Sequence, residues 1–219
     1  MASTKIINLK QNQVDIWRLN LDLDENSLNE LQNLLSEEEI TRAEKLKSKE
    51  LRRRFIAARG MLRKILSRYT RKNPQDLKFQ YNQNGKPELV DSQIYFNLSH
   101  SQDLALCAVA LNPVGIDLEK IKDNLNHLKL AQEYFSEKEY NCILNLPQEQ
   151  QKKAFYQIWT RKEAYVKAKG SSLSKSLSRD LDTPGWFITD LNIDSYATAL
   201  AIESKKIEIR PLTLSQLSD

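Results

Sequence analysis

The amino-acid sequence predicts an α+β fold. Two observations carry this prediction: apolar residues recur with helical spacing in some segments and alternate or run together in others, and segments of the first kind precede those of the second. Grouped helices and grouped strands, rather than strict alternation, are typical of α+β proteins. Because this order occurs twice, we expect an N-terminal α+β half of residues 1–112 and a C-terminal α+β half of residues 113–219.

The N-terminal half opens with a strand and two helices. Residues 14–23 alternate between apolar and polar from Trp17 onward, which predicts a strand. Residues 26–30 resemble a helix start, because leucines follow them at helical spacing. Ser36 precedes Glu39 by three residues, so each side chain can bond the other's backbone amide in a capping box that begins a second helix.

A long helix follows over residues 40–69, which contain no proline and repeat apolar residues at helical spacing, with a break expected near residues 47–49. Its polar face carries many arginines, namely Arg52, Arg53, Arg54, Arg59, Arg63 and Arg68. A solvated cationic face and a binding surface both fit this pattern. Nucleic-acid binding is disfavoured, because no aromatic residues are interleaved with the charges.

Strands close the first half. Residues 77–81 alternate like a strand and lead into a turn at residues 82–87. Residues 94–101 read as a strand that enters a polar turn, and residues 104–111 are so uniformly apolar that we expect a strand buried on both sides. Asn112 and Pro113 then make a turn into the second half.

The second half repeats this order. Residues 114–120 read as a strand, and helices are expected over residues 128–135, residues 136–146 and residues 148–170, the last stopped by Gly170. Strand-like stretches then follow at residues 186–188, 196–202 and 206–210.

Two short stretches carry side chains suited to chemistry. In the strand at residues 114–120, Asp117 and Glu119 are two apart and therefore share a face. In the last helix, Glu163 and Lys167 are four apart and share a stripe, a spacing that is also typical of surface pairs that only stabilise a helix. Mg²⁺ prefers oxygen ligands shared with substrate phosphates, so the acids and the cation together describe a magnesium and phosphate site. Gly115 would let a ligand approach the backbone closely.

These stretches resemble a known family. Gly115–Glu119 and Trp159–Gly170 are similar to the two signature motifs of the Sfp-type 4'-phosphopantetheinyl transferases. Three further matches fall in the family's order, at Arg52–Phe55, Gly85–Pro87 and Phe96–Ser101. The resemblance implies two similar α+β halves related by a pseudo-twofold axis, with coenzyme A in the cleft between them. It also implies transfer of the 4'-phosphopantetheine arm of coenzyme A to a serine of an acyl or peptidyl carrier protein, with release of 3',5'-adenosine diphosphate.

The resemblance also assigns site residues. Asp117, Glu119 and Glu163 would hold Mg²⁺, Glu163 would help to deprotonate the carrier serine, and Lys167 would neutralise phosphate. The residues that it assigns to coenzyme A are Arg42, Arg54, Lys86, Pro87, Ser99, His100 and Lys167. Glu37, Glu38 and Glu39 stand where other members of the family carry lysines, before the helix that bears the arginines. Which of the arginines binds the 3'-phosphate therefore stays open. A histidine at a strand end is also commonly structural.

Composition sets further limits. The 33 Lys and Arg against 29 Asp and Glu give a net charge of +4, too small to imply a nucleic-acid partner. We expect no membrane partner either, because no signal core is visible and no run approaches the roughly 18 apolar residues of a membrane span. Cys107 and Cys142 are expected to be buried free thiols, which fits a cytoplasmic protein, and we expect a monomer.

Two other functions use part of the same pattern. A Mg²⁺-dependent coenzyme A or nucleotide pyrophosphohydrolase needs the same acids and cations but attacks with water. A non-enzymatic basic binding module would use the arginine helix alone and give the three acids no purpose. A transferase releases nucleotide only when a carrier protein is present, whereas the pyrophosphohydrolase releases it without a carrier. Binding that survives Asp117→Ala would identify the basic binding module.

Overall fold

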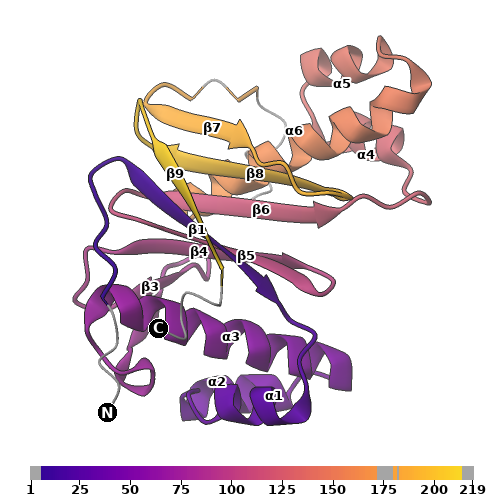
Figure 1. Cartoon of the computed structure of the whole chain (residues 1–219). Coiled ribbons are helices and arrows are strands. Elements are labelled where there is room, and N and C mark those ends of the chain that lie inside the picture. Colours follow the sequence, from indigo (N-terminus) through magenta and orange to yellow (C-terminus); the bar gives the residue numbers. More distant parts are fainter. Residues whose placement is uncertain (1–5, 172–179, 182, 214–219) are drawn as a thin grey trace.

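The computed structural model describes residues 6–171, 180–181 and 183–213. Residues 1–5, which belong to the stretch expected to lack a signal core, lie outside these ranges. The described chain forms a four-stranded sheet in the order β4-β5-β1-β9, a three-stranded sheet in the order β6-β8-β7 and the hairpin β2-β3 (Figure 1). The strands are β1 (Gln13–Asn20), β2 (Phe79–Tyr81), β3 (Pro87–Leu89), β4 (Tyr95–Ser101), β5 (Leu104–Ala110), β6 (Val114–Lys120), β7 (Trp186–Asp190), β8 (Tyr196–Glu203) and β9 (Glu208–Thr213).

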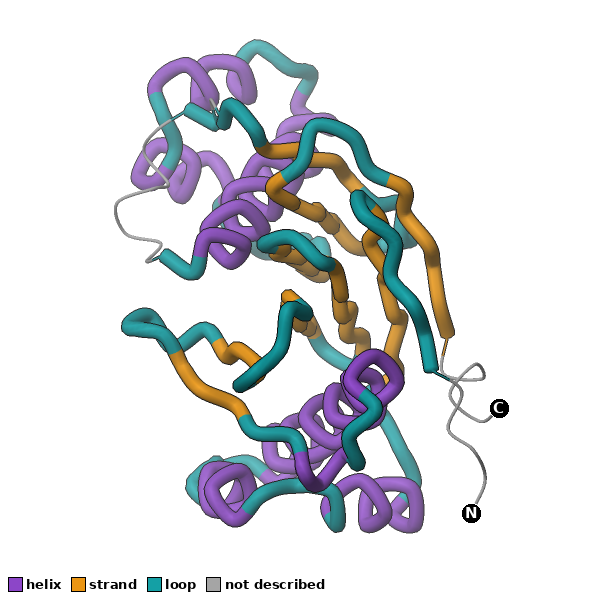
Figure 2. Tube along the Cα trace, turned by 90° about the vertical axis from the view of Figure 1, so that its left-hand side faces the viewer, coloured by secondary structure: helices purple, strands orange, loops and turns teal. Residues whose placement is uncertain are grey.

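The helices lie on the outer sides of the two larger sheets, with those of the first half at one end of the molecule and those of the second half at the other (Figure 2). They are α1 (Glu25–Gln32), α2 (Glu37–Glu44), α3 (Lys49–Thr70), α4 (His127–Tyr134), α5 (Glu137–Leu144) and α6 (Gln148–Lys169), and a short 3-10 turn, η1 (Pro74–Asp76), follows α3. No helix among the described residues has the length and apolar character needed to cross a membrane.

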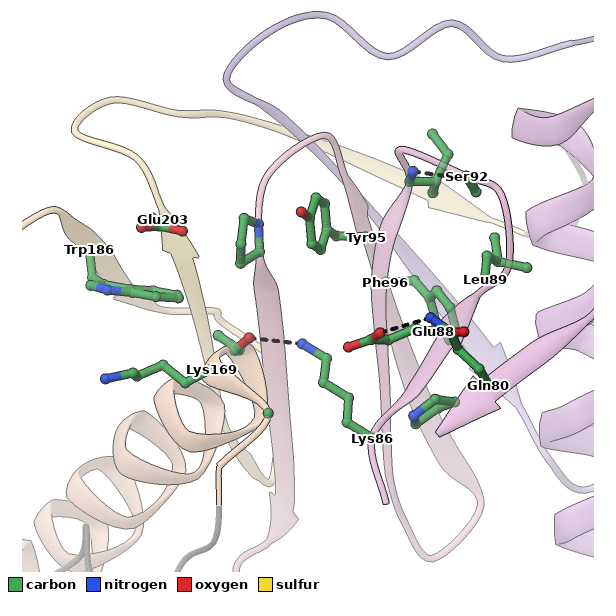
Figure 3. A pocket seen from close by; sticks show the side chains of 15 residues that line it. Gln80, Lys86, Glu88, Leu89, Ser92, Tyr95, Phe96, Lys169, Trp186 and Glu203 are labelled. Atoms are coloured by element: carbon green, nitrogen blue, oxygen red, sulfur yellow. Dashed lines mark hydrogen bonds between the residues drawn. The ribbon is translucent and has the colours of Figure 1, made fainter. Parts of the chain in front are cut away.

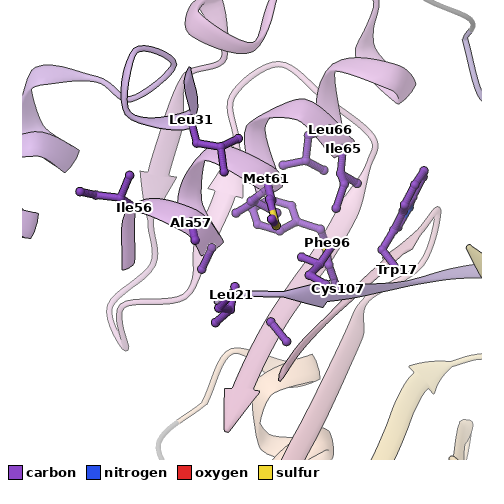
Figure 4. Packing of buried hydrophobic residues seen from close by; sticks show 14 of the residues in the cluster. Trp17, Leu21, Leu31, Ile56, Ala57, Met61, Ile65, Leu66, Phe96 and Cys107 are labelled. Atoms are coloured by element: carbon purple, nitrogen blue, oxygen red, sulfur yellow. The ribbon is translucent and has the colours of Figure 1, made fainter. Parts of the chain in front are cut away.

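Hydrophobic packing joins these elements into four layers. One face of the four-stranded sheet packs on α3, where Trp17, Phe96 and Cys107 of the strands meet Ile65 and Leu66 of the helix (Figure 4). The other face packs on the three-stranded sheet through a second cluster of aliphatic side chains, comprising Val14, Ile16, Leu104, Leu106, Ile116, Leu118, Leu200 and Ile202. Small residues of α6 and β8 form the last contact, so the order of layers is α3, sheet, sheet, α6.

The two halves repeat one arrangement. Each runs through a strand, two helices of 8 residues, a helix of 22 residues and then further strands. The capping-box glutamates also correspond, because Glu39 pairs with buried Arg63 at 2.7 Å and Glu139 pairs with buried Lys162 at 2.8 Å. Arg63 and Lys162 are each the fifteenth residue of the long helix. The prediction of two similar α+β halves is therefore confirmed.

The last strand departs from this symmetry. β9 lies beside β1 in a parallel pair within the sheet of the first half. Arg210 of β9 donates two hydrogen bonds to buried Asp15 of β1, at 2.7 and 2.6 Å, and Tyr69 donates a third to the same carboxylate at 2.7 Å. The division of the chain at residue 112 into two domains stays a prediction, since this strand joins the far end of the chain to its beginning.

Several local expectations were confirmed and others were wrong. The capping box at Ser36 is present, and the break before α3 falls where Ser48 caps that helix. The first helix begins earlier than expected, because Asp24 accepts a hydrogen bond from the Ser27 amide and acts as the N-cap. Cys107 is buried as expected, but Cys142 is exposed, since α5 turns only Ile143 fully inward.

Candidate active site

The site forms where the two larger sheets meet along β4 and β6. The side chain of Asn97 accepts a hydrogen bond from the Ile116 amide at 2.8 Å, and the Ser101 hydroxyl accepts one from the Lys120 amide at 3.0 Å. Both bonds advance in the same direction along the two strands, so β4 and β6 run parallel there. The polar end of β4 therefore lies beside the acidic end of β6.

Gly115 sets how closely α6 approaches this strand. A Cβ atom added to Gly115 would lie 2.1 Å from the Ala164 carbonyl oxygen and 2.3 Å from the Ala168 amide nitrogen. The expectation that a ligand uses this space was wrong, because the helix backbone fills it. Asp117 and Glu119 continue along the face of β6 that Gly115 presents to α6, so the missing side chain brings the helix down onto the two acids.

Asp117 is the centre of the contacts. Its carboxylate is only 2% exposed, and Oδ1 accepts hydrogen bonds from Lys167 Nζ at 2.5 Å and from Ser99 Oγ at 3.0 Å. Lys167 Nζ also lies 3.1 Å from Ser99 Oγ, so three elements meet at this point. The second carboxylate oxygen, Oδ2, is buried and has no hydrogen-bond partner. A buried carboxylate oxygen without a partner is costly, which indicates that a cationic ligand belongs beside it.

The two glutamates respond to the same neighbourhood. Burial raises the pKa of Glu119, and the charge of Asp117 raises it further. Burial also raises the pKa of Glu163, to about 7, with Lys167 opposing and Asp117 and Glu119 reinforcing the rise. These effects indicate that the three acids and Lys167 lie within electrostatic reach of one another, and their role as a metal and phosphate site stays a prediction.

The acids suit a divalent cation without forming a finished metal site. In the part of the chain that the structure describes, no three carboxylate, imidazole or thiol groups already stand in a metal-binding arrangement. Instead the Lys167 ammonium holds Asp117 Oδ1, while Oδ2 is left unpaired. Hard carboxylate oxygens with one unpaired buried member are the donors that Mg²⁺ accepts, so the residues fit such an ion.

Cationic groups lie next to the acids. Desolvation by the surrounding chain lowers the pKa of His100, and the charges of Lys167 and Arg54 lower it further, so both cations lie within electrostatic reach of His100. Arg54 extends from α3 and donates to Asp103 Oδ1 at 3.0 and 2.6 Å. Arg42 of α2 packs instead over Phe55 of α3, with its guanidinium 5.7 Å from the centre of the ring.

Lys86 and Pro87 border a pocket of about 600 Å³ beyond the end of α6 (Figure 3). Lys86 crosses to the second half, where its ammonium donates to backbone carbonyls rather than to a side chain. Burial lowers the pKa of Lys86 to about 8. Tyr95 and Trp186 line the same pocket, so it extends from β4 to the start of β7.

Sequence reasoning missed the residues that join the two strands. Asn97 and Ser101 bond to β6, and Ser101 Oγ also donates to Glu119 at 3.4 Å. The signal was present, because Asn97, Ser99 and Ser101 alternate on one face of β4. The sequence does not show that this face of β4 bonds to β6, so the role of the alternating polar residues could not be predicted from it.

Comparison with known proteins gives the same family as the motifs. Residues 113–211 match the model of the 4'-phosphopantetheinyl transferase superfamily, and residues 24–112 match that of the 4'-phosphopantetheinyl transferase N-terminal region. The chain is 44% identical over 174 residues to the 4'-phosphopantetheinyl transferase HetI of Nostoc sp. strain PCC 7120, covering 77% of this chain and 73% of HetI. It is 32% identical over 146 residues to the 4'-phosphopantetheinyl transferase Sfp of Bacillus subtilis strain 168, covering 66% and 64% of the two chains. The 4'-phosphopantetheinyl transferase gsp of Aneurinibacillus migulanus is 36% identical over 120 residues, covering 55% and 49%. The protein therefore belongs to the 4'-phosphopantetheinyl transferase family and is a transferase.

Proposed function

We propose that this transferase moves the 4'-phosphopantetheine group of coenzyme A onto a serine of an acyl or peptidyl carrier protein, with Mg²⁺ as cofactor and 3',5'-adenosine diphosphate as the product released. The observation that carries the proposal is that Lys167 and Ser99 both donate to Asp117, whose Oδ2 is buried without a hydrogen-bond partner, and that Glu163 lies within electrostatic reach of Asp117 and Lys167. An acidic centre flanked by cations is the environment that a pyrophosphate and its counter-ion require.

Asp117, Glu119 and Glu163 are the residues that would hold the cation. The unpaired Oδ2 of Asp117 supports this assignment, as do the raised pKa values of the two glutamates, since a nearby positive charge would favour their ionised forms. When bound, Mg²⁺ offsets the charge of the pyrophosphate and polarises its phosphoryl oxygens.

Glu163 is our candidate for the general base. Without a cation, burial raises the pKa of Glu163 to about 7, and a bound Mg²⁺ would lower it, so we propose that this carboxylate accepts the proton of the carrier serine either directly or through an intervening water. Its placement on a rigid helix one turn before Lys167 supports a fixed distance between the proton acceptor and the cation.

Cationic and polar side chains on both halves would bind coenzyme A. Lys167 contacts Asp117, and the charges of Lys167 and Arg54 both alter the pKa of His100, which supports a phosphate-binding group. The complete set that we assign to coenzyme A is Arg42, Arg54, Lys86, Pro87, Ser99, His100 and Lys167. Arg54 would exchange its bonds to Asp103 for bonds to phosphate.

We also infer a cytoplasmic monomer. Both cysteines are free, and free thiols, one of them exposed, fit a reducing compartment.

Intact-mass analysis tests the reaction directly. Purified protein is incubated with coenzyme A, Mg²⁺ and several apo-carrier proteins, and a carrier should gain the mass of one phosphopantetheine. Glu163→Gln should abolish the gain under the same conditions. Release of 3',5'-adenosine diphosphate that proceeds equally without any carrier would instead identify a pyrophosphohydrolase and end the transferase proposal.

A further inference from the structure

The turn between β2 and β3 reaches across the molecule to the end of α6. The side-chain amide of Asn82 donates a hydrogen bond to the Gly170 carbonyl oxygen at 2.9 Å, and the side-chain amide of Asn84 donates to the same oxygen at 2.8 Å. The two asparagines stand in the first half, and Gly170 ends the helix that carries Glu163 and Lys167. Two amides from a distant turn therefore hold one carbonyl of the catalytic helix.

Lys86 of the same turn adds a third donor. Its ammonium donates to the Ala168 carbonyl oxygen at 2.9 Å and to the Val114 carbonyl oxygen at 3.2 Å, as the dashed line to the end of α6 indicates in Figure 3. Val114 is the residue before Gly115, so this one nitrogen connects the turn, the helix end and the strand on which the helix rests. We refer to Asn82, Asn84 and Lys86 as the α6 clamp.

The chemistry of a helix end explains why these donors matter. The last carbonyls of a helix have no partners within it, and they carry the negative end of the helix dipole. Amide and ammonium donors satisfy both needs at Ala168 and Gly170. Gly170 has a φ of +60°, and an added Cβ would lie 2.4 Å from the Asn82 amide nitrogen, so a side chain here would disturb both the helix end and the clamp.

The turn is itself held in shape before it contacts the helix. The Asn82 carbonyl oxygen Oδ1 accepts hydrogen bonds from the backbone amides of Asn84, at 2.9 Å, and Lys86, at 3.0 Å. Gly85 supplies the φ of +80° that the turn requires. Asn82 therefore uses one end of its amide to fix the turn and the other to hold α6.

The clamp complements the contact at Gly115. Close contact at Gly115 sets the distance between α6 and β6, and two hydrogen bonds from Arg161 to Asp190 of β7 hold the middle of the helix, whereas movement of its last turn along the axis is a separate displacement. Bonds to the final carbonyls oppose that movement. Lys167 directly precedes Ala168, so a shift of the helix end carries the Lys167 ammonium away from Asp117.

We infer that the α6 clamp is a positioning device for phosphopantetheine transfer, which fixes the axial position of the end of α6 and thereby holds Lys167 against Asp117. This inference rests on the proposed function for its catalytic part. Asn82 and Asn84 are positioning residues that act through Lys167, since a displacement of about 1 Å at reacting groups can cost about 100-fold in rate.

Asn82→Asp is the sharpest test. The aspartate keeps the oxygen that accepts the two turn amides, but it replaces the donor with an anionic oxygen facing the Gly170 carbonyl. Gln75→Glu is the matched control, because the Gln75 side-chain amide donates to the Asn33 carbonyl oxygen at 2.9 Å, at the end of α1. Asn84→Asp repeats the test while leaving the internal bonds of the turn in place.

Hydrogen exchange and transfer kinetics report the outcome. We expect the amides of residues 166–170 to exchange at least about tenfold faster in Asn82→Asp, and kcat at saturating coenzyme A and carrier to fall at least about tenfold, with both unchanged in Gln75→Glu. In a Lys167→Ala background, Asn82→Asp should cause no further loss of kcat, because the clamp acts through that lysine.

Three results would overturn the inference: unchanged exchange at the end of α6, faster exchange with wild-type kcat, or losses that are fully additive with Lys167→Ala. A wild-type protein that modifies no carrier would refute the proposed function and the catalytic part of the inference together. Exchange measured without substrate would then still decide whether the turn holds the helix.

Discussion

Replacing Gly115 with alanine tests whether backbone contact between β6 and α6 sets the geometry of the site. The added Cβ would lie 2.1 Å from the Ala164 carbonyl oxygen, whereas contacts under 3.0 Å are essentially never seen, so the helix must move by about 1 Å. The Lys167 ammonium now lies 2.5 Å from Asp117 Oδ1, and a movement of that size would break the contact.

We expect Gly115→Ala to lower kcat about 100-fold, since a 1 Å misplacement of reacting groups can cost that much. Overpacking should also lower the free energy of unfolding by about 1–3 kcal/mol. Transfer to an apo-carrier would be followed by intact mass at saturating coenzyme A and Mg²⁺, and stability by urea unfolding. Gly60→Ala is the control, because its Cβ would lie 2.6 Å from Leu31 Cβ and would crowd α1 against α3, away from the site. Wild-type kcat in Gly115→Ala would refute the reasoning, and so would an equal loss in Gly60→Ala.

Three further predictions concern charged groups. Lys167→Ala should reduce transfer at least about 100-fold with coenzyme A saturating, measured by intact mass, because it removes the cation at Asp117, and normal turnover would contradict this role. Burial alone would raise the pKa of Glu39, but Arg59, the Ser36 amide and Arg63 outweigh burial and lower that pKa. The stability that Glu39 contributes is therefore present above pH 4.5 and is lost as the pH falls through the lowered pKa. Urea unfolding of Glu39→Gln should therefore show a loss of about 3 kcal/mol at pH 7 and a smaller loss at pH 3, and equal losses would contradict the shift. Arg210→Met should cost about 3–5 kcal/mol in the same assay, because it leaves buried Asp15 without its bidentate partner, and a loss below 1 kcal/mol would contradict this account.

Local rules predicted the parts of this molecule that depend on neighbours in sequence. The capping box of Ser36 and Glu39 needs only three residues of spacing, and the shared face of Asp117 and Glu119 needs only two, so both could be found in the sequence. The general expectation that a free cysteine is buried was wrong for Cys142, because α5 is short and the sequence does not show which of its sides meets the core.

Contacts between distant residues could not be found in this way. The Asn82 amide meets the Gly170 carbonyl across 88 positions, and neither residue has a local feature that names the other. Gly115 appeared to leave room for a ligand, because its sequence context cannot show that a helix backbone occupies the space. Family motifs supplied the list of site residues, whereas the reason why Lys167 meets Asp117 came only from the packing of α6 on β6.

The pairing of β9 with β1 has a consequence for how the chain is made. Arg210 leaves the ribosome 195 residues after Asp15, the buried acid that it neutralises. Until then the growing polypeptide holds β1 with one open edge and with a buried acid that has Tyr69 as a hydrogen-bond donor but lacks its cationic partner. We therefore expect the first half to remain incompletely folded during translation, and a fragment ending at residue 112 to be unstable unless the missing strand is supplied as a separate peptide.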